Sequence, residues 1–103
     1  MNGTPSTIRV IIVGAGKGGT ALLELLSRSP DVETVGVADV NPEALGLCLA
    51  RNLGIRTATD AQALIAEDRA DLIVDVTGDP AMRSLLLQHK PPRAEIMGGT
   101  SAL

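Results

Sequence analysis

The stretch IRVIIVGAGKGGTALLELL, residues 8–26, decides the fold of this chain. It opens with IRVIIV, an apolar and largely β-branched run that is typical of a strand buried on both faces of a parallel sheet. A glycine-rich loop follows at residues 14–19, and leucines then recur with helical spacing up to Leu26. A strand, a glycine loop and a helix in this order predict a site for the phosphates of a nucleotide.

Two phosphate-binding motifs compete for this loop. Gly14, Gly16 and Gly19 fit G-x-G-x-x-G, the dinucleotide fingerprint. In that motif the first glycine makes a tight turn, the second lets the backbone approach a pyrophosphate, and the third lets the helix pack close to the strand. The alternative is the ATP-type loop G-x-x-x-x-G-K-[ST], but Thr20 stands where its lysine belongs and Lys17 lies inside the loop. The sequence therefore favours a dinucleotide.

An acidic residue at the end of the next expected strand strengthens this interpretation. Asp39 follows Gly19 by 20 residues, and a carboxylate at this place can accept hydrogen bonds from the adenosine ribose. Its negative charge would repel a 2′-phosphate, and neither Val40 nor Asn41 offers a cation to neutralise one. The sequence predicts NAD as the preferred cofactor over NADP. The alternative is a structural Rossmann loop with a solvated carboxylate beside it.

The rest of the chain alternates between expected strands and helices. The strands are predicted at 8–13, 33–39, 55–58, 71–76 and 94–97, and the helices at 18–28, 42–52, 61–67 and 80–89. The expected caps of the last three helices are Asn41 (with Pro42 at the first helical position), Thr59 or Asp60, and Asp79. The pattern predicts an α/β fold: a Rossmann-like, doubly wound parallel sheet of about five strands with helices on both faces. We expect a single dinucleotide-binding domain over residues 1–103, with its crevice beyond the carboxyl ends of the strands.

Composition limits the classes of function. The chain has 103 residues and a net charge of -3, which argues against the basic face that nucleic-acid binding needs. It has no aromatic residue and so no platform on which single-stranded bases could stack. No apolar run approaches the ~18 residues of a membrane span, MNGTPST lacks the pattern of a signal peptide, and the single cysteine permits a reducing compartment. We expect a cytoplasmic protein that binds neither nucleic acid nor membrane.

The sequence contains no evident catalytic constellation. His89 is expected to be exposed late in the last helix, and Cys48, in a leucine-rich helix, is expected to be a buried structural thiol without a base partner. No group of His, Cys, Asp and Glu has the spacing of metal ligands. Asp75 could serve a site at the end of its strand, and Gly98-Gly99 could approach a ligand or simply turn the chain. We therefore expect no catalytic residue and no metal.

The order of these segments resembles a known family. IRVIIVGAGKGGTALLELL, VGVADVNPEAL, GIRTATDAQALI and ADLIVDVTGDP are similar to the N-terminal NAD(P)-binding domain of the glucose–fructose oxidoreductase-like (Gfo/Idh/MocA) dehydrogenases and of homoserine and aspartate dehydrogenases. The resemblance implies that Asp39 binds the ribose and that the loop after the fourth strand lies near the nicotinamide half. The residues it assigns to the pyrophosphate are Gly14, Ala15, Gly16, Lys17 and Gly18, and those near the nicotinamide are Thr77, Gly78 and Pro80.

The resemblance does not extend to catalysis. In the sugar dehydrogenases the fifth strand ends in a Glu-Lys-Pro motif with a catalytic lysine, where this chain has AEIMGGTSAL. Their large C-terminal domain, which shapes the substrate pocket, has no counterpart in these residues. We therefore expect the chain to be an N-terminal module or piece of a longer protein.

Three functions remain open on this basis. The first is an NAD(H)-binding module that senses the cofactor or regulates an attached domain, without catalysis of its own. The second is the cofactor-binding half of an NAD-dependent oxidoreductase. The third is a degenerate Rossmann domain that acts in protein–protein interaction. Because the third and fifth strands should form the sheet edges, and an unpaired edge invites pairing, we also expect a homodimer.

Overall fold

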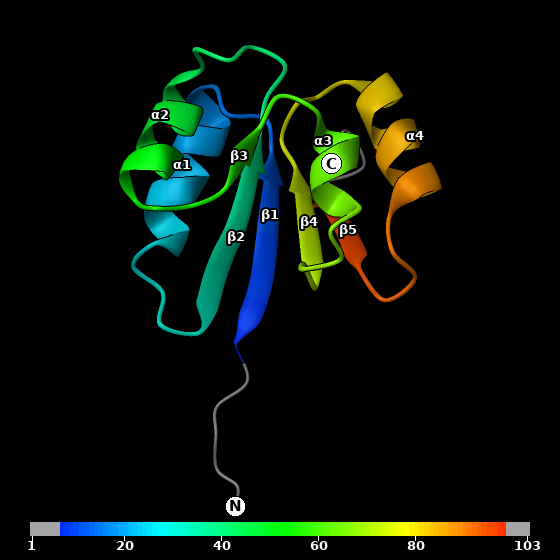
Figure 1. Cartoon of the computed structure of the whole chain (residues 1–103), viewed down its shortest axis with the longest axis horizontal. Helices are drawn as coiled ribbons and strands as arrows, with labels where there is room; N and C mark the ends of the chain where they lie inside the picture. Colours follow the sequence, from blue (N-terminus) through cyan, green and yellow to red (C-terminus); the bar gives the residue numbers. More distant parts are fainter. Residues whose placement is uncertain (1–6, 99–103) are drawn as a thin grey trace, which may run out of the picture.

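The computed structural model describes residues 7–98, in which five parallel strands alternate with four helices (Figure 1). The strands are β1 (Ile8–Val13), β2 (Val32–Ala38), β3 (Thr57–Ala58), β4 (Leu72–Asp75) and β5 (Glu95–Gly98). The helices are α1 (Lys17–Leu26), α2 (Leu45–Asn52), α3 (Ala61–Ile65) and α4 (Pro80–His89). The strand order is β3-β2-β1-β4-β5, and every pairing is parallel. The predicted Rossmann-like, doubly wound sheet is confirmed, and β3 and β5 are its edges.

The helices cover both faces of the sheet. α1 and α2 pack together on one face, and α3 and α4 pack together on the other (Figure 1). Alternate side chains of β1 serve the two cores: Val10 and Ile12 lie under α1 and α2, whereas Ile11 and Val13 lie under α3 and α4. β1 is thus buried on both faces, which is why its sequence is continuously apolar.

The strand order places the glycine loop where the chain changes direction across the sheet. From β1 the chain runs through α1 and α2 to the β3 edge, and α3 then carries it back across to β4 on the other side of β1. The loops after β1 and β4 therefore lead to helices on opposite faces. Such a switch point opens a crevice at the carboxyl ends of the strands, which lie uppermost in Figure 1.

The second helix begins later than predicted. Asn41 does not cap it; its Oδ1 accepts the N–H of Glu43 at 3.0 Å and closes a turn, and α2 starts only at Leu45. The Gly46 N–H donates to the carbonyl of Ala15 at 2.8 Å, which fixes the start of α2 against the glycine loop. The expected start at Pro42 was wrong because this contact between distant segments, and not the local cap signal, sets the position.

The prediction of a buried Cys48 was also wrong, since this side chain is exposed. The buried residues of α2 are Gly46, Leu47 and Ala50, and the N-cap residue Ala44 is buried beside them. Cys48 follows Leu47 and is turned about 100° away from it around the helix axis, which takes it out of the core. His89 is exposed, as predicted.

The remaining boundaries follow the sequence closely. β1 and α4 span their predicted ranges, and the other elements shift by one or two residues at one or both ends. Asp60 caps α3 by accepting the N–H groups of Gln62 and Ala63, and Asp79 caps α4 by accepting that of Ala81. These two caps are confirmed, and Asp60, not Thr59, is the cap of α3.

Candidate functional site

A cleft of about 370 Å³ opens at the carboxyl end of the sheet. This volume lies within the range of about 300–1,000 Å³ that is usual for small-molecule sites. Four of the residues predicted to bind a cofactor line it, namely Gly14, Gly16, Asp39 and Thr77. They come from the ends of β1, β2 and β4, so the fold brings together three segments that are far apart in the sequence.

Gly14 and Gly19 have the structural roles that the fingerprint assigns to them, in the turn and in the packing of the helix. Gly14 has φ +105°, a backbone conformation that L side chains rarely adopt, and it makes the turn out of β1. A Cβ at Gly19 would collide with the Gly14 carbonyl oxygen, so the absent side chain lets α1 pack against β1. A Cβ at Gly16 would meet nothing within 4 Å. The backbone at Gly16 therefore faces open space at the cleft, where an anion can approach it.

Asp39 holds the glycine loop as well as facing the cleft. Its Oδ2 accepts the N–H of Ala15 at 2.7 Å, and its Oδ1 accepts the N–H of Asn41 at 2.8 Å. A carboxylate offers about four lone-pair positions, so this side chain, which is half-buried and lines the cleft, can still accept hydrogen bonds from a ligand. The Ala15 side chain is fully buried, and its carbonyl accepts from Gly46. Hydrogen bonds thus hold both the N–H and the carbonyl of Ala15 in place.

The start of α1 supplies the donors of the site. No side chain caps this helix at Gly16, and its first turn contains no acidic residue. The first N–H groups of a helix have no partner within it and carry partial positive charge, which suits a phosphate. Lys17 and Gly18 lie exposed in this turn, beside the cleft lining.

The loop between β4 and α4 forms the opposite wall. Val76, Thr77 and Asp79 line the cleft, and Thr77 is anchored to the buried Asp75 through its N–H at 2.9 Å and its hydroxyl at 2.6 Å. Gly78 and Pro80, which the resemblance placed near the nicotinamide, are exposed neighbours of this wall outside the lining. Asp75 itself is buried beneath the loop and is 1% exposed.

The sequence did not predict several residues that line the cleft: Val40, Thr59, Ala61, Val76 and Met82. Asp79 also lines it, although the sequence predicted Asp79 only as a helix cap. All but Met82 come within four residues of the end of β2, β3 or β4, so the rule that such sheets bind at their carboxyl ends could have found them. Met82 lies further on, inside α4, and only the packing of that helix brings its side chain to the cleft.

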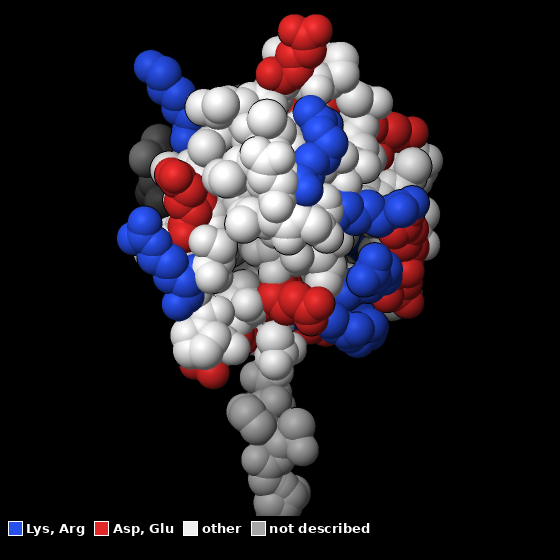
Figure 2. Space-filling view, turned by 60° about the vertical axis from the view of Figure 1, so that its left-hand side comes forward, with Lys and Arg blue, Asp and Glu red and all other residues white. Residues whose placement is uncertain are grey.

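The candidate reactive groups His89 and Cys48 lie apart from the cleft, and charges of both signs are mixed on the surface. Neither His89 nor Cys48 is in the cleft lining, and within residues 7–98 no group of His, Cys, Asp and Glu is arranged to hold a metal ion. Figure 2 shows acidic and basic side chains interspersed on one face, without a large field of either sign. In the part of the chain that the structure covers, no helix has the length and hydropathy to span a membrane.

Comparison with known proteins gives relatives among dehydrogenases. The chain is 36% identical over 78 residues to acetaldehyde dehydrogenase 1 of Comamonas testosteroni, an alignment of 72% of this chain and 25% of the relative. The acetaldehyde dehydrogenase of Pseudoalteromonas translucida is 40% identical over 67 residues, with 64% of this chain and 22% of the relative covered. The chain thus spans about a quarter of the length of the curated relatives it matches.

Solved structures share the fold. GenD2 from gentamicin A biosynthesis, solved in complex with NAD, aligns with a TM-score of 0.70 at 26% identity, over 81% of this chain and 24% of that one. Prephenate dehydrogenase from A. aeolicus, solved with hydroxyphenyl propionate and NAD+, aligns with a TM-score of 0.67 at 25% identity, over 88% of this chain and 32% of that one. The predicted likeness to the N-terminal domains of oxidoreductases is confirmed.

A family model extends this likeness over nearly the whole chain. The model described as "Dihydrodipicolinate reductase, N-terminus" matches residues 8–101. The match runs from the first residue of β1 through β5, and so includes the glycine loop, Asp39 and the loop after β4. The chain is therefore a Rossmann-like domain that belongs to the family of dihydrodipicolinate reductase N-terminal domains.

Proposed function

We propose that this domain binds NAD(H) in the cleft at the carboxyl end of its sheet. The observation that carries the proposal is the position of Asp39, which joins the glycine loop through Ala15 and still faces the cleft. The residues present fit the cofactor, because Gly16 leaves its backbone open to a pyrophosphate and Asp39 keeps acceptor positions for ribose hydroxyls. The relatives solved with NAD support the same conclusion.

The arrangement of the walls suggests the direction in which the cofactor lies. The adenosine ribose would bind at Asp39, with the adenine against Val40 and Thr59 at the ends of β2 and β3. The pyrophosphate would lie over Gly16 at the start of α1, where helix N–H groups favour an anion. The nicotinamide half would then extend toward Thr77, on the loop after β4.

We further propose that NAD is preferred over NADP. A 2′-phosphate would stand beside the Asp39 carboxylate, and the next residue, Val40, is uncharged and 76% exposed. Val40→Arg places a cation there that can pair with the phosphate. The ratio of the NADP and NAD dissociation constants should then fall about tenfold, which corresponds to about 1.4 kcal/mol. An unchanged ratio in a calorimetric titration would count against a 2′-phosphate position beside Asp39 and Val40.

Two biological roles are compatible with cofactor binding. The names of the relatives and the share of their length that the chain covers favour the cofactor-binding part of an oxidoreductase. The second role is a sensing or regulatory module without catalysis, for which the same cleft would serve as the cofactor site. In both roles the chain supplies the cofactor site; in the first role, other parts of the oxidoreductase would supply the reacting groups.

Calorimetric titration with NAD, NADH, NADP and ATP tests the proposal. We expect micromolar binding of NAD or NADH, weakened about tenfold or more in Asp39→Ala, which loses the ribose acceptor and the anchor of Ala15. Asp31→Ala is the matched control, because it removes the same charge from an exposed site before β2 and should bind like the wild type. If neither NAD nor NADH binds at millimolar concentration, the proposal is wrong and an interaction module becomes the better interpretation.

A further inference from the structure

Asp75 is a charged side chain in the core, and packing alone does not account for it. It is 1% exposed, and no other charged side chain in the described residues is buried. Its Oδ2 is buried and has no hydrogen-bond partner within residues 7–98. Burying a carboxyl whose hydrogen bonds are incomplete is unfavourable, whereas Ile73, two residues earlier on β4, packs in the core as an ordinary aliphatic side chain. The contacts of the other oxygen, Oδ1, explain why an acid stands at position 75.

That other oxygen starts a chain of hydrogen bonds that runs through the cleft wall. Oδ1 of Asp75 accepts the N–H of Thr77 at 2.9 Å and its hydroxyl at 2.6 Å. The Thr77 hydroxyl accepts the N–H of Asp79 at 3.2 Å, and Oδ1 of Asp79 accepts the N–H of Ala81 in α4 at 3.0 Å. Because the hydroxyl has one proton and gives it to Asp75, its lone pairs are left for Asp79. Asp75 thus orients the Thr77 hydroxyl, and the other donors of the series are backbone N–H groups.

The wall held in this way also touches the glycine loop. A Cβ at Gly14 would lie 3.1 Å from Cγ2 of Val76 and 3.2 Å from the backbone nitrogen of Thr77, so the two loops are in close contact. The N–H of Val76 donates to the carbonyl of Val13 at 2.9 Å. Val76, Thr77 and Asp79 line the cleft, but Asp75 does not. Asp75 can therefore act on a ligand only through the loop that it holds.

We infer that Asp75 is a positioning residue for the dinucleotide: it holds the loop 76–79 in the conformation that receives the nicotinamide half. The inference rests on the proposed function and adds to it a residue that the ligand never touches. The adenosine half lies on the Asp39 side of the cleft and does not depend on Asp75. The Oδ2 atom, which has no hydrogen-bond partner within residues 7–98, is buried as a consequence of placing Oδ1 within reach of both polar groups of Thr77.

The test compares three variants of the full chain, with NADH and AMP as ligands. Asp75→Ala removes the acceptor, and we expect it to weaken NADH binding about tenfold while AMP binding changes by less than about twofold. Asp75→Asn keeps an oxygen that accepts both bonds from Thr77, and should restore most of the NADH affinity. Ile73→Val, on the same strand and the same face, lowers the thermal stability by loss of a core methyl group and should leave both affinities unchanged.

Amide hydrogen exchange gives a readout that needs no ligand. The N–H groups of Thr77 and Asp79 should exchange faster in Asp75→Ala than in the wild type, in Asp75→Asn or in Ile73→Val. Equal losses of NADH and AMP affinity in Asp75→Ala, or unchanged exchange of these two amides, would overturn the inference. If the wild-type chain binds no NADH, the proposed function fails; faster exchange in Asp75→Ala then still supports Asp75 as the residue that holds this wall, and unchanged exchange refutes it.

Discussion

At the scale of single residues, the glycine loop contains neighbours with opposite requirements. Gly18 and Gly19 both lie in the first turn of α1, where glycine is normally unfavourable because it loses more backbone entropy than alanine on folding. A Cβ at Gly18 would meet nothing within 4 Å, whereas a Cβ at Gly19 would collide with the Gly14 carbonyl. The fingerprint in the sequence assigned a packing role to Gly19, and the close approach of α1 to β1 is the reason for it.

Alanine substitutions at these two positions should therefore change the free energy of unfolding in opposite directions. Gly19→Ala forces α1 away from β1 and should destabilise the domain by about 1–3 kcal/mol, as overpacking usually does. The Cβ of Gly18→Ala fits without a clash. This substitution should stabilise the domain by about 0.4–1 kcal/mol, because alanine lowers the conformational entropy of the unfolded chain. Urea unfolding followed by circular dichroism measures both. A Gly19→Ala domain as stable as the wild type would mean that the helix moves without strain.

At the scale of elements, the start of α2 is decided by its contact with the glycine loop. A Cβ at Gly46 would lie 2.9 Å from the Cβ and carbonyl oxygen of Ala15 and from Oγ1 of Thr20. The helix approaches the loop this closely only because position 46 has no side chain. α2 thereby holds the carbonyl side of Ala15 while Asp39 holds its N–H, and the glycine loop is fixed from both sides.

Gly46→Ala separates helix propensity from packing. Propensity alone predicts that alanine in a helix stabilises by about 1 kcal/mol relative to glycine. The contact with Ala15 predicts the opposite, a loss of about 1–3 kcal/mol together with weaker NADH binding, because the glycine loop is displaced. Thermal unfolding and an NADH titration of the same variant show whether alanine raises or lowers the stability and the NADH affinity. A gain in stability would show that α2 is free to shift.

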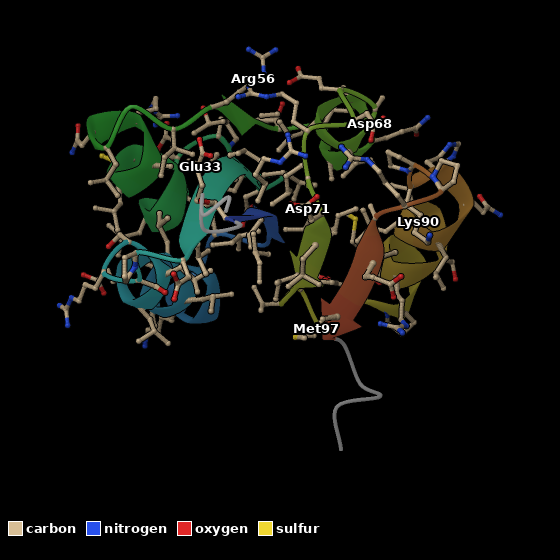
Figure 3. All side chains as sticks on the ribbon, turned by 90° about the horizontal axis from the view of Figure 1, so that it is seen from below. Glu33, Arg56, Asp68, Asp71, Lys90 and Met97 are labelled. Atoms are coloured by element: carbon tan, nitrogen blue, oxygen red, sulfur yellow. The ribbon has the colours of Figure 1, made fainter. Side chains whose placement is uncertain are left out.

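At the scale of the whole molecule, an ionic network joins the strands at the end opposite the cleft. Asp71, just before β4 (Figure 3), accepts the Arg9 N–H of β1 at 2.9 Å and pairs with the guanidinium groups of Arg9 and Arg93, each at 3.4 Å. Arg93 also lies 3.7 Å from Asp68. These side chains are partly exposed, so solvent screens the pairs and each contributes little. The network connects β1, β4 and the approach to β5.

The pH dependence of stability should report this network. Hydrogen bonds from the backbone N–H of Arg9, and next from its side chain, hold the pKa of Asp71 below its ordinary value of 3.8. A group whose pKa is lower in the folded state stabilises the fold fully above its unfolded pKa, and this contribution is lost as the pH falls through the folded pKa. Asp71→Asn should therefore flatten the fall in Tm below about pH 4. Glu24→Gln, on the exposed side of α1, is the control and should leave the curve unchanged.

Association between copies also belongs to this scale and stays a prediction. β5 is a sheet edge, and its Met97 is 57% exposed (Figure 3). An open edge with an exposed apolar side chain favours pairing with a second chain. Sedimentation velocity at rising concentration should show a dimer, which Met97→Lys on the same edge weakens; a single monomeric species at all concentrations would contradict it.

The sequence by itself determined the alternation of strands and helices, the parallel sheet, the glycine turn and the acid at the end of β2. These features depend on local periodicity and on residue types that short-range geometry requires, so they can be predicted without knowledge of distant contacts. The tertiary structure alone decided that α2 starts at Leu45, that Cys48 faces solvent and that Met82 reaches the cleft. It also decided that Thr77 donates to the buried Asp75 and that Asp39 and Gly46 both bond to Ala15. Each of these depends on contacts between segments far apart in the chain, whose relative placement is fixed by packing and not by local sequence.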